Sequence, residues 1–179
     1  MNSIYYLKIV FISIFIVSSA YSRSQVRRAG DVLQIALPAT ALCMTYAYDD
    51  IDGRNSFYKA FATTSVATLI LKRITNKTRP DGSDNYSFPS GHTSAAFSGA
   101  SFIFKRYGLK YGLPSYLAAA FVGYSRVYSK KHYWEDVVAG ASLAILNTYL
   151  FSKSLKNGSG EFDAYIDTSE IKINFIIPL

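Results

Sequence analysis

Five long uncharged runs between residues 32 and 152 constrain the fold of this chain more than any other feature. Each run is too long for a typical strand and is rich in Ala, Leu, Phe and Ser, so each is predicted to be a helix. The runs are Val32–Tyr48, Ala60–Leu71, Thr93–Phe104, Tyr111–Ser125 and Val137–Ser152. We therefore expect an all-α helical bundle of about six helices, made of an N-terminal leader or first transmembrane helix and five core helices, with a short C-terminal tail.

Composition favours a membrane setting for this bundle. Charged residues make up 17% of the chain, against roughly 25% in an ordinary soluble domain. No run reaches the roughly eighteen residues of a simple membrane span, so a transmembrane bundle requires that charged residues at the run ends belong to the helices and reach the interface. The mean hydropathy of +0.12 leaves a soluble bundle open.

The two ends of the chain differ from the helical middle. Lys8, the apolar run Ile9–Val17 and the small residues near Ala20 have the layout of a secretory signal, although an uncleaved first membrane helix has the same pattern. We therefore divide the chain into a signal peptide or first transmembrane helix (1–22), a helical domain (23–155) and a tail of unknown role (156–179). Within the tail, "EIKINFIIPL" has the partial alternation of a short strand.

The net charge of +7 suggests anionic partners such as phosphate esters or acidic lipids. Nucleic acid is not expected, because the basic residues are interleaved with uncharged stretches and no groove-reading motif is present. The single cysteine, Cys43, excludes a cysteine-rich metal site.

The first polar cluster is "LKRITNKTRP", which contains Lys72 and Arg79. Seven residues correspond to two helical turns, so both side chains are predicted to point the same way before Pro80 ends the helix. A basic helix end stabilised by the helix dipole is the simpler alternative.

The second cluster is "PSGH", in which Ser90, Gly91 and His92 precede an apolar run. Ser90 can simply cap that helix. Alternatively, the free N–H groups of the first turn bind an anion, Gly91 lets it approach the backbone, and His92 exchanges a proton with it.

The third cluster is "SRVYSKKHYWED", with Arg126, His132 and Asp136. His132 and Asp136 are four residues apart, so on a helix the carboxylate could accept from one imidazole nitrogen and raise the basicity of the other. Arg126 offers a planar fork for phosphate oxygens. An ordinary surface ion pair is the alternative for His132 and Asp136. If successive helices alternate in direction, all three clusters lie at one end of the bundle.

Taken together, the clusters follow the pattern K-x6-R-P, P-S-G-H, S-R-x5-H-x3-D. This pattern resembles that of the type 2 phosphatidic acid phosphatase family, which also includes bacterial non-specific acid phosphatases and vanadium haloperoxidases. The resemblance covers about Lys72 to Asp136. Its matched residues are Lys72, Arg79, Pro80, Pro89, Ser90, Gly91, His92, Ser125, Arg126, His132 and Asp136.

The resemblance implies that His132 is the nucleophile that forms a phosphohistidine, that Asp136 orients it, and that His92 is the general acid and then the general base. Lys72, Arg79, Arg126, the Ser90 hydroxyl and the Gly91 N–H would hold the phosphate oxygens. Because fixed cations would take the electrostatic role of Mg²⁺, no metal or other cofactor is expected. Arg73, Lys77, Lys130 and Lys131 are interpreted as solvated charges.

The leading hypothesis is therefore a lipid phosphatase in a bacterial inner membrane, with its site facing the periplasm and a phosphorylated lipid as partner. A soluble periplasmic acid phosphatase is the alternative. A vanadate-dependent haloperoxidase and a non-catalytic membrane bundle are less favoured hypotheses.

Overall fold

The computed structural model describes residues 22–155 and the strand residues 162–166 and 171–175. Of the expected leader, residues 1–22, only Ser22 belongs to the described residues. Within these described residues, five helices follow one another: α2 (Arg23–Ala47), α3 (Ile51–Thr75), α4 (Gly91–Tyr107), α5 (Leu109–Tyr128) and α6 (Trp134–Phe151). An antiparallel hairpin, β1 (Phe162–Ile166) and β2 (Ile171–Phe175), follows them. The prediction of five core helices and of a short strand in the tail is confirmed.

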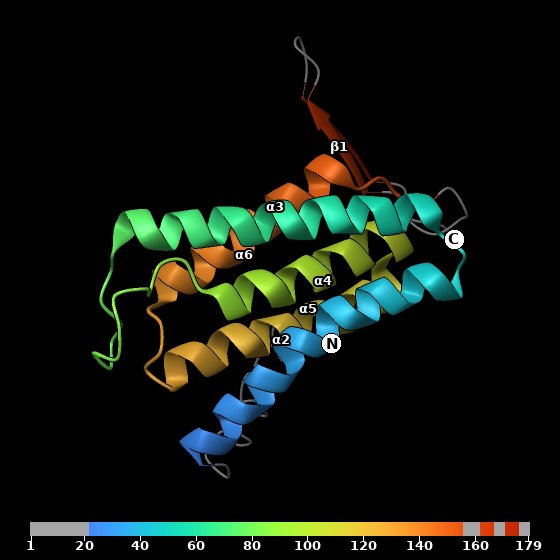
Figure 1. Cartoon of the computed structure of the whole chain (residues 1–179). Helices are drawn as coiled ribbons and strands as arrows, with labels where there is room; N and C mark the ends of the chain where they lie inside the picture. Colours follow the sequence, from blue (N-terminus) through green and yellow to red (C-terminus); the bar gives the residue numbers. More distant parts are fainter. Residues whose placement is uncertain (1–21, 156–161, 167–170, 176–179) are drawn as a thin grey trace, which may run out of the picture.

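Helix α4 lies in the middle of the bundle and packs against the other four helices (Figure 1). Its small buried residues allow this close packing. A Cβ on Gly99 would lie 2.5 Å from the carbonyl carbon of Leu37 and 2.6 Å from the backbone N of Pro38 in α2. The apolar core surrounds this helix, with Ala96, Ala100, Phe102 and Ile103 almost completely buried.

The end of the bundle that carries the three polar clusters is formed where α3 ends, α4 begins, α5 ends and α6 begins (Figure 1). Helix α3 ends at Thr75 because Asn76 adopts a left-handed conformation (φ 43°), as Asn tolerates better than most residues. The expectation that the helix continues to Pro80 is therefore wrong, and Arg79 belongs to the connecting segment 76–90.

A buried ion pair joins elements at the opposite end. The carboxylate of Asp50 accepts from Nε of Arg106 at 2.7 Å and from the Tyr107 hydroxyl at 3.0 Å, and both charged side chains are almost fully buried. Asp50 therefore neutralises a cation in the interior, because a buried guanidinium requires a partner.

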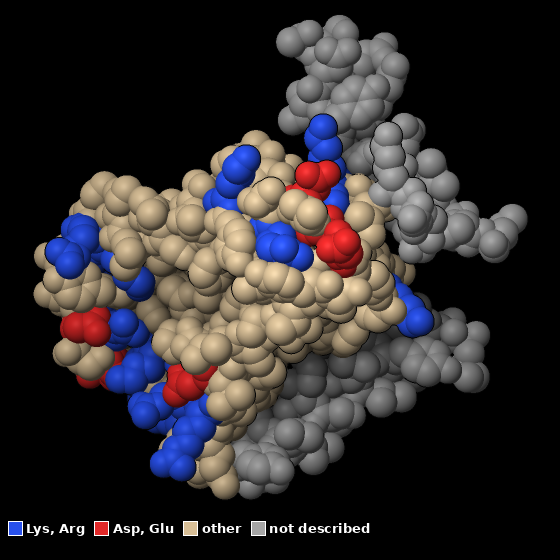
Figure 2. All heavy atoms as spheres, turned by 45° about the vertical axis from the view of Figure 1, so that its right-hand side comes forward, with Lys and Arg blue, Asp and Glu red and all other residues tan. Residues whose placement is uncertain are grey.

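Charged side chains are unevenly distributed over the surface. Figure 2 shows them gathered at the left and lower edge of the view, where segment 76–90 and the start of α2 lie, and in a second group toward the top. A broad uncharged band separates the two groups on this face. Within the described residues, no helix combines the length and the apolar character expected of a membrane span.

Candidate active site

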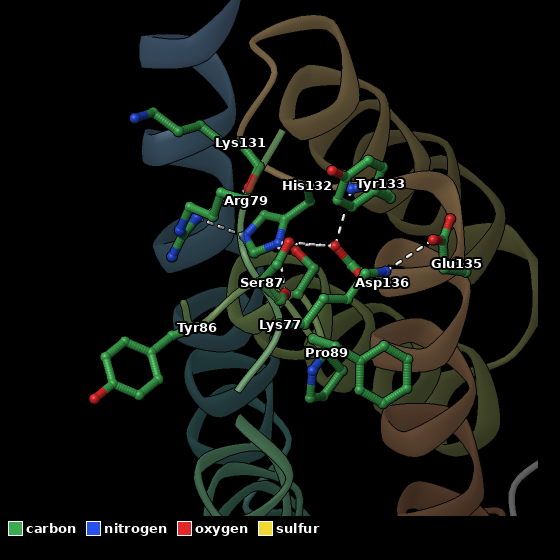
Figure 3. Close-up of polar contacts among 12 residues, drawn as sticks. Lys77, Arg79, Tyr86, Ser87, Pro89, Lys131, His132, Tyr133, Glu135 and Asp136 are labelled. Atoms are coloured by element: carbon green, nitrogen blue, oxygen red, sulfur yellow. Dashed lines mark hydrogen bonds and ion pairs between the residues drawn. The ribbon is translucent and has the colours of Figure 1, made fainter. Parts of the chain in front are cut away.

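His132 lies in the short connection between α5 and α6, and its side chain is only 2% exposed. Nδ1 is 2.7 Å from the backbone oxygen of Ser87. Since a carbonyl oxygen only accepts, Nδ1 carries the proton and Nε2 has a free lone pair. Nη1 of Arg79 donates to that lone pair at 3.1 Å (Figure 3). Burial and the neighbouring Arg79 and Lys72 lower the pKa of His132 to about 3, so the ring is neutral at physiological pH.

Asp136, in the first turn of α6, is fully buried, and its carboxylate accepts three hydrogen bonds. Its carboxylate accepts from Nζ of Lys77 at 2.7 Å, from the Ser87 hydroxyl at 2.5 Å and from the Tyr133 N–H at 2.9 Å (Figure 3). These bonds hold a charge in the interior that would otherwise be costly.

The expected hydrogen bond between His132 and Asp136 is not formed. Nδ1 is 3.6 Å from the nearest carboxylate oxygen, because His132 precedes α6 and does not share its helical face with Asp136. Ser87 connects them instead, since its hydroxyl donates to Asp136 and its carbonyl accepts from His132. Nothing in the spacing of the sequence indicated this role for Ser87.

Two lysines interpreted as solvated charges form ion pairs in the structure. Lys77 contacts Glu135 at 2.8 Å as well as Asp136, and Lys131 contacts Asp81 at 2.6 Å. The Lys131 ammonium and the Ser83 side chain lower the pKa of Asp81. That earlier interpretation is therefore wrong for both lysines. Lys77 attaches segment 76–90 to the first turn of α6, and Lys131 attaches it to the connection between α5 and α6.

Arg79 is held in the same way. Its Nε donates to Asp84 at 2.7 Å and its Nη1 to the carbonyl of Lys131 at 3.1 Å. Gly82, with φ of 70°, turns the chain so that Asp84 returns toward Arg79. The guanidinium is thereby fixed beside the His132 ring.

Lys72 lies near the end of α3, and its ammonium donates to the carbonyls of Tyr86 at 2.7 Å and Pro89 at 2.6 Å. It thus secures the approach to α4. Lysine has three donor hydrogens, so one remains for another acceptor.

Ser90 is the N-cap of α4 and is completely buried. Its hydroxyl oxygen accepts from the Thr93 hydroxyl at 2.9 Å and from the Thr93 N–H at 3.4 Å. The capping interpretation therefore describes its observed contacts. At Gly91, an added Cβ would meet Lys72 Cε at 3.6 Å, which is an ordinary contact, so protein packing does not require a glycine here.

His92 and Arg126 meet at a carboxylate that sequence reasoning missed. Oδ1 of Asp31, in α2, lies 3.0 Å from Nε2 of His92 and 2.7 Å from Nη1 of Arg126. Asp31 lies outside the three clusters, and no spacing rule connects it to them.

A single pocket of about 270 Å³ brings the two histidines together with two of the three predicted phosphate-binding cations. Lys72, Ser90, Gly91 and Asp136 do not line it. The lining residues are Arg27, Asp31, Arg79, Ser83, Asp84, His92, Arg126, Lys131 and His132. The pocket is therefore rich in cations and contains two imidazoles, which suits a phosphate ester. In the described part of the chain, no three His, Cys, Asp or Glu side chains lie close enough together to hold a metal ion.

Comparison with known proteins identifies the family of this chain. Residues 9–158 match the model of the PAP2 superfamily. The chain belongs to the PAP2 superfamily. Its fold is also that of a solved structure, LpxE of Aquifex aeolicus, which aligns with a TM-score of 0.63 at 22% identity over 72% of this chain and 83% of the other.

Two curated proteins are similar to part of this PAP2 chain. A lipid A 1-phosphatase of Porphyromonas gingivalis is 41% identical over 71 residues, and a lipid A 4'-phosphatase of Helicobacter pylori is 40% identical over 68 residues. Each match covers 38% of this chain, but only 16% and 34%, respectively, of the relatives' own lengths.

Proposed function

We propose that this chain hydrolyses a phosphate monoester of a membrane lipid through a phosphohistidine intermediate. The observation that carries the proposal is that His92, His132, Arg79 and Arg126, up to 53 positions apart, line one pocket. Membership of the PAP2 superfamily supports the same chemistry.

In the first step, the Nε2 lone pair of His132 attacks phosphorus and the ester P–O bond breaks. His92 donates a proton to the departing alkoxide. The hydrogen bond from Nδ1 to the Ser87 carbonyl keeps the tautomer in which Nε2 is free. The low pKa of about 3 keeps His132 unprotonated even in mild acid.

In the second step, His92 removes a proton from water as the water oxygen attacks phosphorus. The P–N bond to His132 then breaks, which releases inorganic phosphate and regenerates both rings. Arg79 and Arg126 offset the charge that develops on the phosphoryl oxygens. Lys72, near the end of α3, and the Gly91 N–H, at the start of α4, complete the proposed cradle.

We further propose that the lipid is a phosphorylated glycolipid of the lipid A type and that the site faces the periplasm. The curated relatives' names support this substrate class. The uncharged band between the two charged groups in Figure 2 supports a bundle embedded in a bilayer, with the pocket at one surface.

The test is phosphate release by the purified full chain in detergent, with EDTA present, from lipid A, phosphatidic acid, phosphatidylglycerophosphate, an isoprenoid diphosphate and a soluble aryl phosphate. We expect metal-independent release that is fastest from lipid A. Equal rates on all esters would overturn the lipid assignment, and no release from any of them would overturn the phosphatase assignment. A chain recovered in the soluble fraction without detergent would overturn the membrane location.

A further inference from the structure

Asp31 connects two residues that the proposed chemistry assigns to different tasks. Its Oδ1 accepts from Nη1 of Arg126, which would bind phosphate, and contacts Nε2 of His92, which would move the proton. The three side chains come from α2, α5 and α4, and all line the same pocket.

The part of α2 next to Asp31 packs closely against Arg126. The carbonyl of Arg27 accepts from Nη2 of Arg126 at 2.7 Å. A Cβ on Gly30 would lie 2.1 Å from the Ser125 hydroxyl oxygen and 2.8 Å from Nη2 of Arg126. Only a glycine at position 30 therefore lets α2 come close enough for Asp31 to reach the guanidinium.

These contacts hold Arg126 without using all its donors. Its side chain is 3% exposed, so the cation depends on a nearby carboxylate for compensation. A guanidinium has five N–H groups, and the bonds to Asp31, Arg27 and Ser125 use three. Two N–H groups remain for phosphoryl oxygens.

The same carboxylate determines which nitrogen of His92 is available. Because Nε2 faces Asp31 at 3.0 Å, Nδ1 is the nitrogen left to meet the leaving oxygen. In the protonated ring, Nε2–H would donate to Asp31 and Nδ1–H to the alkoxide. Burial, Arg126 and Arg79 disfavour the protonated ring of His92, and Asp31 acts in the opposite direction.

We infer that Asp31 is a positioning residue that aims the proton donor His92 at the leaving oxygen while it holds Arg126 on the phosphate. This inference rests on the proposed phosphatase function. It assigns to α2, which carries none of the three sequence clusters, a direct part in organising the site.

The test is Asp31→Asn, which keeps size but removes the charge, assayed on two monoesters, one with an alkoxide and one with a nitrophenolate leaving group. General acid catalysis contributes about 10²–10⁴-fold, and a nitrophenolate needs little protonation. We expect kcat on the alkyl ester to fall about tenfold to a hundredfold, with a much smaller loss on the nitrophenyl ester. Asp31→Glu, which keeps the charge, should retain more activity on the alkyl ester than Asp31→Asn.

The control is Asp49→Asn, the same chemical change at an exposed residue at the opposite end of the bundle. Its φ of 48° is one that Asn tolerates. Equal losses on both esters would overturn the role of Asp31 in aiming His92, and no loss on either ester would overturn both of its roles. A wild-type chain inactive on both esters would overturn the proposed function itself, and the role of Asp31 with it. Thermal unfolding of each variant identifies a loss that comes from misfolding.

Discussion

Nη1 of Arg79 lies 3.1 Å from Nε2 of His132, so the proposed phosphate-binding guanidinium is directly beside the proposed nucleophilic atom (Figure 3). An arginine side chain only donates hydrogen bonds, which means that Nε2 is an acceptor with an available lone pair. An oxygen of a phosphate that enters the pocket would replace Nε2 as the acceptor of this Arg79 N–H. Binding would then bring phosphorus next to the nitrogen that attacks it.

Replacement of His132 by Asn is expected to abolish turnover. The amide cannot form the phosphoryl–nitrogen bond, so kcat/KM should fall by roughly 10³-fold or more. Phosphate release from the lipid substrate measures the effect, with Asp49→Asn as the control for handling and folding. A His132→Asn variant that keeps a tenth of wild-type activity would contradict the nucleophile assignment.

The stability of the folded chain should decrease at acid pH because of His132. Burial and repulsion by Arg79 hold its folded-state pKa at about 3, whereas a histidine in the unfolded chain titrates at about 6.5. Between these values the unfolded chain binds a proton that the folded chain does not, so stability falls as pH drops below about 6.5 and stops falling near 3. Thermal unfolding between pH 7 and pH 4 should show a shallower decline for His132→Asn than for wild type. Parallel declines would show that the buried ring does not titrate in this way.

Lys77 is expected to matter for stability because it neutralises the buried carboxylate of Asp136. Lys77→Met leaves that charge without its cation and should destabilise the chain by roughly 2–4 kcal/mol. Adding Asp136→Asn should recover part of the loss, since the uncompensated charge is then gone. Chemical unfolding of the two single variants and the double variant measures the coupling. Lys59→Met, at an exposed position of α3, is the matched control. An equal loss of unfolding free energy in Lys59→Met would contradict the stabilising role of Lys77.

The sequence predicted those parts of the molecule that depend on local pattern. Each of the five uncharged runs falls almost entirely within one of the five described helices, and alternating helix directions bring Arg79, His92, Arg126 and His132 to one end. Contacts between distant segments were missed. Asp31 reaches Arg126 across 95 positions and Lys77 reaches Asp136 across 59. Such pairs depend on how closely two helices or loops approach, which the spacing within one segment does not encode. The end of α3 was misplaced because Asn76 stops the helix before Pro80 can.

Two glycines of α4 should respond in opposite ways to alanine. At Gly99, a Cβ would lie 2.5–2.7 Å from backbone atoms of Leu37 and Pro38. These atoms cannot move without shifting α2, so Gly99→Ala should destabilise the chain by about 1–3 kcal/mol.

At Gly91, the nearest atom is in the flexible Lys72 side chain at 3.6 Å, so Gly91→Ala should unfold at the wild-type temperature or slightly above it. If phosphate binds against the first turn of α4, however, the new methyl group occupies that space and activity should fall by tenfold or more, roughly the cost of 1.4 kcal/mol in binding. Thermal unfolding and phosphate release measured on both variants separate packing from function, and a fully active Gly91→Ala would place the phosphate elsewhere in the pocket.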